Sequence, residues 1–259
     1  MSHTLGAVLF FCVVFLVTLG CLEAGIRIGR RALSGPDAHR PAGLGTVETV
    51  AFGVLGLLLA FTFSGAASRF DARRALVVEE ANDIGTAWLR LDLLPAASQP
   101  QLRDAFRRYA DSRILMYKKV ADLDIDGARA EYARAGAIQN EIWAGAVAAC
   151  REAPSQATIV LLPALNAMID ITTTRLAATE MHPPKVVYAV LFVVSFGCAL
   201  LAGYEMGASA ARSWLHVLAY AIGVAFILYV IADFEYPRIG LIRVEAIDHY
   251  LVDVRNAMK

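Results

Sequence analysis

Three carboxylates lie within five residues of the chain, at Glu79, Glu80 and Asp83. Paired carboxylates can transfer protons, but adjacent side chains on a helix point about 100° apart. Glu79 and Asp83 share a helix face, where like charges repel unless a cation lies between them. Arg73 and Arg90, about two turns away, could supply that cation. We interpret the segment either as a salt-bridged helix surface or subunit contact, or as a vestibule that attracts cations.

A second acidic segment, Asp122-Leu-Asp124-Ile-Asp126-Gly127, begins like a calcium-binding loop. Oxygen ligands would stand at its first, third and fifth positions, with glycine at the sixth. Calcium also needs a bidentate carboxylate at the twelfth position, where this chain has Ala133, while Glu131 falls two places early. We therefore predict an interhelical turn whose aspartates cap a helix, with no metal bound.

Other patterns typical of enzymes are missing from the sequence. No two histidines are four residues apart, and no cysteines form a CxxC pair, so no zinc ligand set is visible. Gly53 with Gly56, and Gly203 with Gly207, have small-residue spacings that let membrane helices pack closely. They are not phosphate-binding loops, because neither pair follows a strand and the chain has no Gly-Lys-Ser/Thr. We expect no enzymatic activity and no cofactor.

Composition places the chain among membrane proteins. Its 259 residues are 58% hydrophobic and 19% charged, with a mean hydropathy of +0.53, which is too apolar for an ordinary soluble domain. A bilayer core about 30 Å thick needs roughly 20 apolar residues per helix. Four segments qualify, at residues 5–26, 47–67, 186–204 and 214–232. The formal net charge is zero, so no global field indicates nucleic acid as a partner.

The predicted fold class is an all-α membrane protein with four transmembrane helices in two pairs and a long helical soluble domain between the second and third. We assign the first helix pair to residues 1–67, the soluble domain to 68–184, the second pair to 185–233 and a short C-terminal tail to 234–259. The first segment is interpreted as an uncleaved membrane helix. An even number of spans puts both termini and the middle domain on one side, although Lys and Arg are balanced between the two orientations.

The second membrane segment becomes cationic at Arg69 without a Gly-Pro break, so one long helix is predicted to run from the bilayer to Leu94, where Pro95 ends it. Further soluble helices are predicted at about 101–120, 127–151 and 157–179. The first of these has one broad apolar face, formed by Leu102, Phe106, Tyr109, Ile114 and Tyr117. Just beyond the fourth span, Asp233 and Glu235 are expected to pair with Arg238 at the membrane surface.

Two runs, Leu58-Leu-Ala-Phe61 and Arg69-Phe-Asp-Ala-Arg-Arg74, resemble bestrophins, and more closely the bacterial bestrophin-like domain family. Bacterial bestrophins have a similar apolar run, with an Arg-aromatic pair eight residues after its Phe. The further family-like segments are Val77-Val-Glu-Glu-Ala-Asn-Asp83, Gly203-Tyr-Glu-Met-Gly207 and Pro237-Arg-Ile-Gly-Leu-Ile-Arg243. The resemblance covers about residues 45–245.

The resemblance implies a homo-oligomeric channel for small monovalent ions in the bacterial inner membrane. As in bestrophins, it would be a pentamer with the second span lining the pore, and its middle domain and termini would be cytoplasmic. The bestrophin neck is formed by apolar residues at i, i+4 and i+8, which here correspond to Gly53, Leu57 and Phe61. The spacing places them on one stripe, and such a ring could gate by dewetting. The alternative is that Leu57 and Phe61 are ordinary lipid-facing or packing residues.

This chain also departs from the bestrophin pattern. Thr62-Phe-Ser-Gly-Ala follows Phe61, where bacterial bestrophins have an Arg and amides, so the sign of the ion stays open. Bestrophins have a long cytoplasmic tail with a calcium clasp after the fourth span, and we do not carry calcium gating over to this chain.

Two functions are compatible with these patterns. The first is a passive ion channel in the lipid bilayer. Its neck would be followed by hydroxyls at the pore mouth and by carboxylates in a vestibule, namely Thr62, Ser64, Ser68, Glu79, Glu80 and Asp83. The second is a non-conducting membrane interaction or sensor protein whose middle domain docks a partner. In the second case Leu57→Ala or Phe61→Ala would change stability and not conductance.

Overall fold

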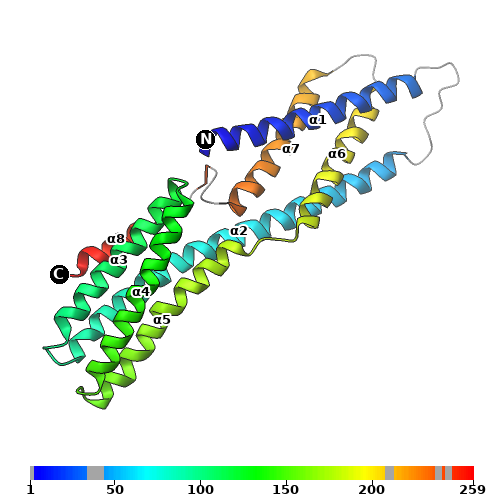
Figure 1. Ribbon diagram of the computed structural model, residues 1–259. Coiled ribbons are helices and arrows are strands. Elements are labelled where there is room, and N and C mark those ends of the chain that lie inside the picture. The colour runs from blue at the N-terminus through cyan, green and yellow to red at the C-terminus, as the bar shows by residue number, and fades with distance from the viewer. Residues whose placement is uncertain (1–2, 34–43, 208–212, 237–240, 243–246) are drawn as a thin grey trace. The chain divides into compact units, whose positions relative to one another are not determined.

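The computed structural model describes residues 3–33, 44–207, 213–236, 241–242 and 247–259 (Figure 1). The helices in chain order are α1 (His3–Leu33), α2 (Leu44–Arg90), the 3-10 helix η1 (Leu91–Leu93), α3 (Gln99–Ala121), α4 (Ile125–Cys150), α5 (Ser155–Glu180), α6 (Lys185–Gly207), α7 (Trp214–Glu235) and α8 (His249–Ala257). The chain forms two compact units. Unit 1 comprises Met1–Phe70 and His182–Ile242, and unit 2 comprises Asp71–Met181 and Arg243–Lys259.

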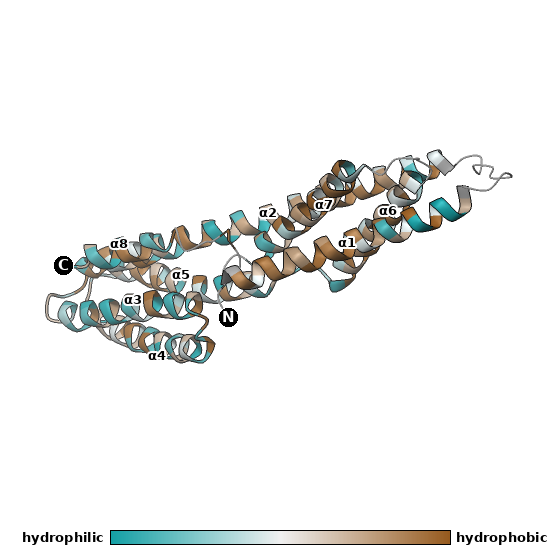
Figure 2. Cartoon of the chain, turned by 90° about the horizontal axis from the view of Figure 1, so that it is seen from above, coloured by the Kyte–Doolittle hydropathy of each residue, from teal (hydrophilic) through white to brown (hydrophobic). Residues whose placement is uncertain are grey.

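The all-helical class and the four apolar helices are confirmed. Each predicted segment lies in a helix long and apolar enough to cross a membrane, namely α1, α2, α6 or α7. Figure 2 shows apolar residues along α1, α6 and α7, whereas hydrophilic residues are frequent on α3 and α8. The predicted continuation of the second span is also confirmed, since α2 runs without interruption to Arg90 and η1 follows it.

In unit 1, α1 packs closely along α6 and less extensively along α7. The contact with α6 depends on glycine. A Cβ added to Gly25 would lie 2.1 Å from the Leu200 carbonyl oxygen, and one added to Gly203 would lie 2.1 Å from that of Leu22. The two backbones therefore touch, as predicted for the Gly203/Gly207 spacing. By contrast, a Cβ on Gly53 or Gly56 would meet no atom of another described segment within 4 Å, so that pair mediates no such contact among the described residues.

The membrane part of α2 packs much more loosely than α1 and α6. It reaches α7 through long aromatic side chains: Phe52 meets Tyr220 with ring centroids 6.3 Å apart, and Phe63 meets Phe234 at 5.6 Å. Only 11% of its most apolar stretch is buried. Most of the apolar surface of this part of α2 is therefore left for lipid or for another protein chain.

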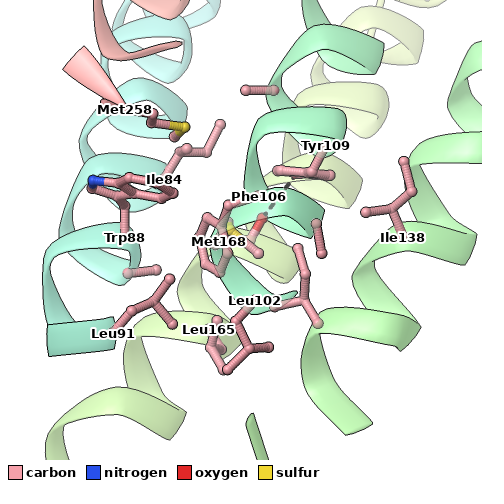
Figure 3. Close-up of a cluster of buried hydrophobic side chains, with 14 of the residues drawn as sticks. Ile84, Trp88, Leu91, Leu102, Phe106, Tyr109, Ile138, Leu165, Met168 and Met258 are labelled. Carbon is pink, nitrogen blue, oxygen red and sulfur yellow. Dashed lines mark hydrogen bonds between the residues drawn. The ribbon is translucent and has the colours of Figure 1, made fainter. Parts of the chain in front are cut away.

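Unit 2 is a helical bundle with a continuous apolar core (Figure 3). The predicted apolar face of α3 points into it: Leu102, Phe106, Tyr109 and Tyr117 are buried, and Ile114 packs against the cluster. Trp88 of α2 meets Phe106 edge to face, with ring centroids 6.1 Å apart. α5 contributes Leu161, Leu165 and Met168.

The C-terminal region was expected to be only a short tail, but it contains helix α8, which packs on α3. Leu251 and Met258 are buried in the unit 2 core. Arg255 donates to both carboxylate oxygens of Asp111, at 2.7 and 3.0 Å, and Arg107 donates to the Met258 carbonyl at 3.0 Å. The family-like segment Pro237 to Arg243 lies almost wholly outside the described residues.

Candidate functional site

The residues assigned to the neck lie on the uncovered face of α2. Gly53 is exposed, Leu57 is 57% exposed and Phe61 is 68% exposed, although the latter two are large and apolar. The buried positions of this part of the helix include Leu55 and Ala66. At 100° per residue Ala66 lies about 180° from Leu57, so the packed face and the stripe are on opposite sides of the helix.

The hydroxyls assigned to the pore mouth differ in their hydrogen bonding and exposure. Thr62 donates its hydroxyl proton to the Leu58 carbonyl one turn earlier, at 2.5 Å, so its donor is used within the helix. Ser64 and Ser68 are exposed. Both lie within about 20° of Leu57 around the helix axis, and therefore on the stripe.

The three carboxylates assigned to a vestibule have different surroundings. Glu79 is exposed and Asp83 is half-buried, but Glu80 is completely buried in unit 2. The assignment of Glu80 to a vestibule is therefore wrong for the folded protomer, because an ion in solution cannot reach this carboxylate.

Glu80 is instead the centre of a buried charge network. Arg113 donates from Nε to Glu80 Oε1 at 2.6 Å, Arg175 donates to Oε2, and the Tyr117 hydroxyl donates to Oε2 at 3.0 Å. The Arg175 and Arg113 guanidiniums also lie over the Tyr117 ring, 4.0 and 5.0 Å from its centroid. Burial, together with the negative charge of Glu80, raises the pKa of the Tyr117 phenol, which stays neutral.

Arg73 and Arg90, offered as the cation between Glu79 and Asp83, each donate to a backbone carbonyl. Arg73 Nε donates to the Ala178 carbonyl at 2.9 Å, and Arg90 donates to the Val160 carbonyl. The arginines that neutralise Glu80 come from α3 and α5, far away in sequence, and no local spacing could have identified them.

A second ion cluster lies in unit 1 where α7 ends. Arg69 of α2 binds both oxygens of Glu235, from Nε at 2.9 Å and from Nη2 at 2.8 Å. His182 Nδ1 lies 3.1 Å from Glu235 Oε1, and its ring stacks on Tyr236. Glu235 was expected to pair with Arg238, which lies outside the described residues, whereas Arg69 and His182 were not anticipated as its partners.

Asp233, two residues before the end of α7, holds the chain that follows. Its Oδ2 accepts from the backbone N–H groups of Leu241 and Ile242 at 3.1 and 2.9 Å, and from the Tyr229 hydroxyl at 2.9 Å. Asp233 therefore fixes the backbone at residues 241–242 against the end of α7.

The calcium-like segment is a turn with a helix cap, as predicted. Asp124 is the N-cap of α4, and its side chain accepts from the Gly127 N–H at 2.9 Å. This hydrogen bond, together with the nearby Lys119 ammonium, lowers the pKa of Asp124. Leu123 turns the chain with φ at +62°, a conformation seldom adopted by such a residue. Within the described ranges no group of three or more His, Cys, Asp or Glu residues is placed to hold a metal ion.

The bestrophin-like domain family model matches residues 12–247, nearly the whole chain. The chain belongs to the bestrophin-like domain family. The family is a channel family, and the four apolar helices agree with a membrane protein. No curated protein and no solved structure matches the chain significantly.

Proposed function

We propose that copies of this bestrophin-like protein assemble, as a pentamer, into a channel for small monovalent ions whose pore is lined by α2. One observation carries the proposal. The stripe Gly53, Leu57 and Phe61 is exposed in the protomer, on the side opposite the packed residues of α2. In an assembly, a second copy of the chain would cover the surface of α2 on either side of this stripe. Membership in a channel family supports this arrangement.

In this proposal Leu57 and Phe61 form an apolar constriction that loses its water when it narrows. Ser64 and Ser68 offer hydroxyls to an ion just past the constriction, and Thr62 can only accept there. Glu79 and Asp83 remain the vestibule carboxylates, without Glu80.

We place the protein in the bacterial inner membrane, with unit 2 and both termini in the cytoplasm. The family resemblance supports the choice of membrane and side, and helix directions within unit 1 support both termini lying on the same side. Leu22 of α1 meets Gly203 of α6 and Ile26 meets Gly207, so these two helices run in the same direction. Phe52 meets Tyr220 and Phe63 meets Phe234, so α2 and α7 also share a direction. Four consecutive spans that alternate in direction require these two parallel pairs.

Purified full-length protein in planar bilayers tests the proposal. We expect a current, and we expect Leu57→Ala and Phe61→Ala to widen the constriction and increase the open probability or conductance. Val193→Ala is the matched control, because Val193 is an equally exposed apolar residue on α6. Absence of current across several salts would refute the channel and favour a non-conducting sensor or interaction protein. Unchanged current in both neck variants would refute only the neck assignment.

A further inference from the structure

Arg69 lies about 120° around α2 from Leu57, but its side chain folds back toward the proposed pore face, and its guanidinium is only partly used by its ion pair. Nε and Nη2 donate to Glu235, whereas Nη1 makes no hydrogen bond with any described residue. We propose that Arg69 is a charge-selectivity residue of the pore mouth and that it raises the permeability of anions relative to cations. This inference rests on the proposed function.

The position of Nη1 places it beside the stripe. A Cβ added to Gly65 would lie 3.3 Å from Nη1, so the Arg69 side chain folds back over Gly65. On a helix surface Gly65 neighbours Phe61, four residues earlier, and Ser68, three residues later. The guanidinium therefore reaches the region between the neck and the mouth, and the missing side chain at residue 65 leaves room for it.

The ion pair is oriented with its positive end outward. The Arg69 side chain is 32% exposed, whereas that of Glu235 is 0% exposed. Glu235 is held on the packed side by His182 Nδ1 at 3.1 Å as well as by Arg69. An ion at the mouth would meet the guanidinium edge before the carboxylate, so the pair acts as a net positive group despite its zero total charge.

The size of the effect follows from Coulomb's law. In water, a unit charge roughly 7 Å away changes the local concentration of a monovalent ion by about threefold. Several identical subunits would contribute in the same direction. Salt screens such a charge, so the effect should shrink at an ionic strength of about 1 M.

The test is the reversal potential of the full-length channel under a sodium chloride gradient. Arg69→Gln should lower the chloride-to-sodium permeability ratio by at least about threefold, the factor given above for one charge. Glu235→Gln should raise that ratio, because it removes the partly cancelling carboxylate. Arg27→Gln is the matched control, since Arg27 pairs with Glu23 on α1 at 2.8 Å and should not affect the ratio.

Arg69→Gln removes a guanidinium from the buried Glu235, and this variant could fail to fold. The double variant Arg69→Gln with Glu235→Gln removes both charges, and it should lower the ratio in the same direction as the single variant but by a smaller factor, because only the residual field of the pair is lost. A ratio equal to that of Arg27→Gln in these variants would overturn the inference and would mean that Nη1 faces lipid headgroups. Conduction by the wild type would in that case leave the proposed function intact, whereas absence of wild-type current would overturn both.

Discussion

Replacing Glu80 with alanine should strongly destabilise unit 2. The substitution leaves Arg113 and Arg175 buried without their carboxylate, at side-chain exposures of 1% and 8%. Removing one partner of a buried ion pair typically costs about 3–5 kcal/mol. For a chain of this size each kcal/mol lowers Tm by about 2–4 °C. We therefore expect Tm to fall by about 6–20 °C.

The adjacent residue provides the control. Glu79→Ala removes a carboxylate of the same kind from the exposed side of the same helix, and it should change stability by no more than about 0.5 kcal/mol. Glu80→Gln keeps the side-chain volume, so a loss of stability in this variant identifies the charge rather than the packing as the cause. The assay is thermal unfolding of the detergent-solubilised protein, followed by circular dichroism. Equal midpoints for the Glu79→Ala and Glu80→Ala variants would refute the reasoning.

Three further predictions concern packing and capping. Gly203→Ala should lower Tm, because the new Cβ would collide with the Leu22 carbonyl. Gly197→Ala on the same helix is the control and should leave Tm unchanged, since a Cβ there meets no described atom within 4 Å. Equal Tm values for the two variants would contradict the close contact. Leu251→Ala should cost about 2–5 kcal/mol in thermal unfolding if α8 is an integral part of the unit 2 core, and no cost would show that it is not. Asp124→Ala should lower Tm at neutral pH. The pKa of Asp124 is lower in the folded protein than in the unfolded chain, where it is about 3.8. The stability that its carboxylate adds is therefore present above about pH 3.8 and is lost as the pH falls further. The Tm values of the unsubstituted protein and of the Asp124→Ala variant should converge in acid. A difference that stays constant with pH would contradict this.

The features that could be predicted from the sequence are those that depend on local periodicity. The apolar lengths of α1, α2, α6 and α7, the uninterrupted passage of α2 past Arg69, and the aspartate cap at Asp124 are all encoded within a few turns. The resemblance to the family, carried by short runs around Phe61, was likewise confirmed by a match over nearly the whole chain.

Contacts between distant segments could not be predicted in the same way. Glu80 and its exposed neighbour Glu79 differ only in helical phase, and the phase facing the core is decided by α3 and α5, which supply Arg113 and Arg175. The pairing of Arg69 with Glu235 joins residues 166 positions apart. α8 is only nine residues long, and an isolated helix of that length is marginal in water, so its stability comes mainly from docking on α3.

Cysteine accessibility during current recording tests most directly whether α2 lines a pore. Ser64→Cys would place a thiol on the proposed pore face, and Val193→Cys would place one on an exposed apolar position of α6. Each is compared with the unsubstituted chain, whose own cysteines set the baseline. We predict that a charged, water-soluble thiol reagent reduces the current of the Ser64→Cys channel and leaves that of Val193→Cys unchanged. Block of Val193→Cys with no effect on Ser64→Cys would contradict a pore lined by α2.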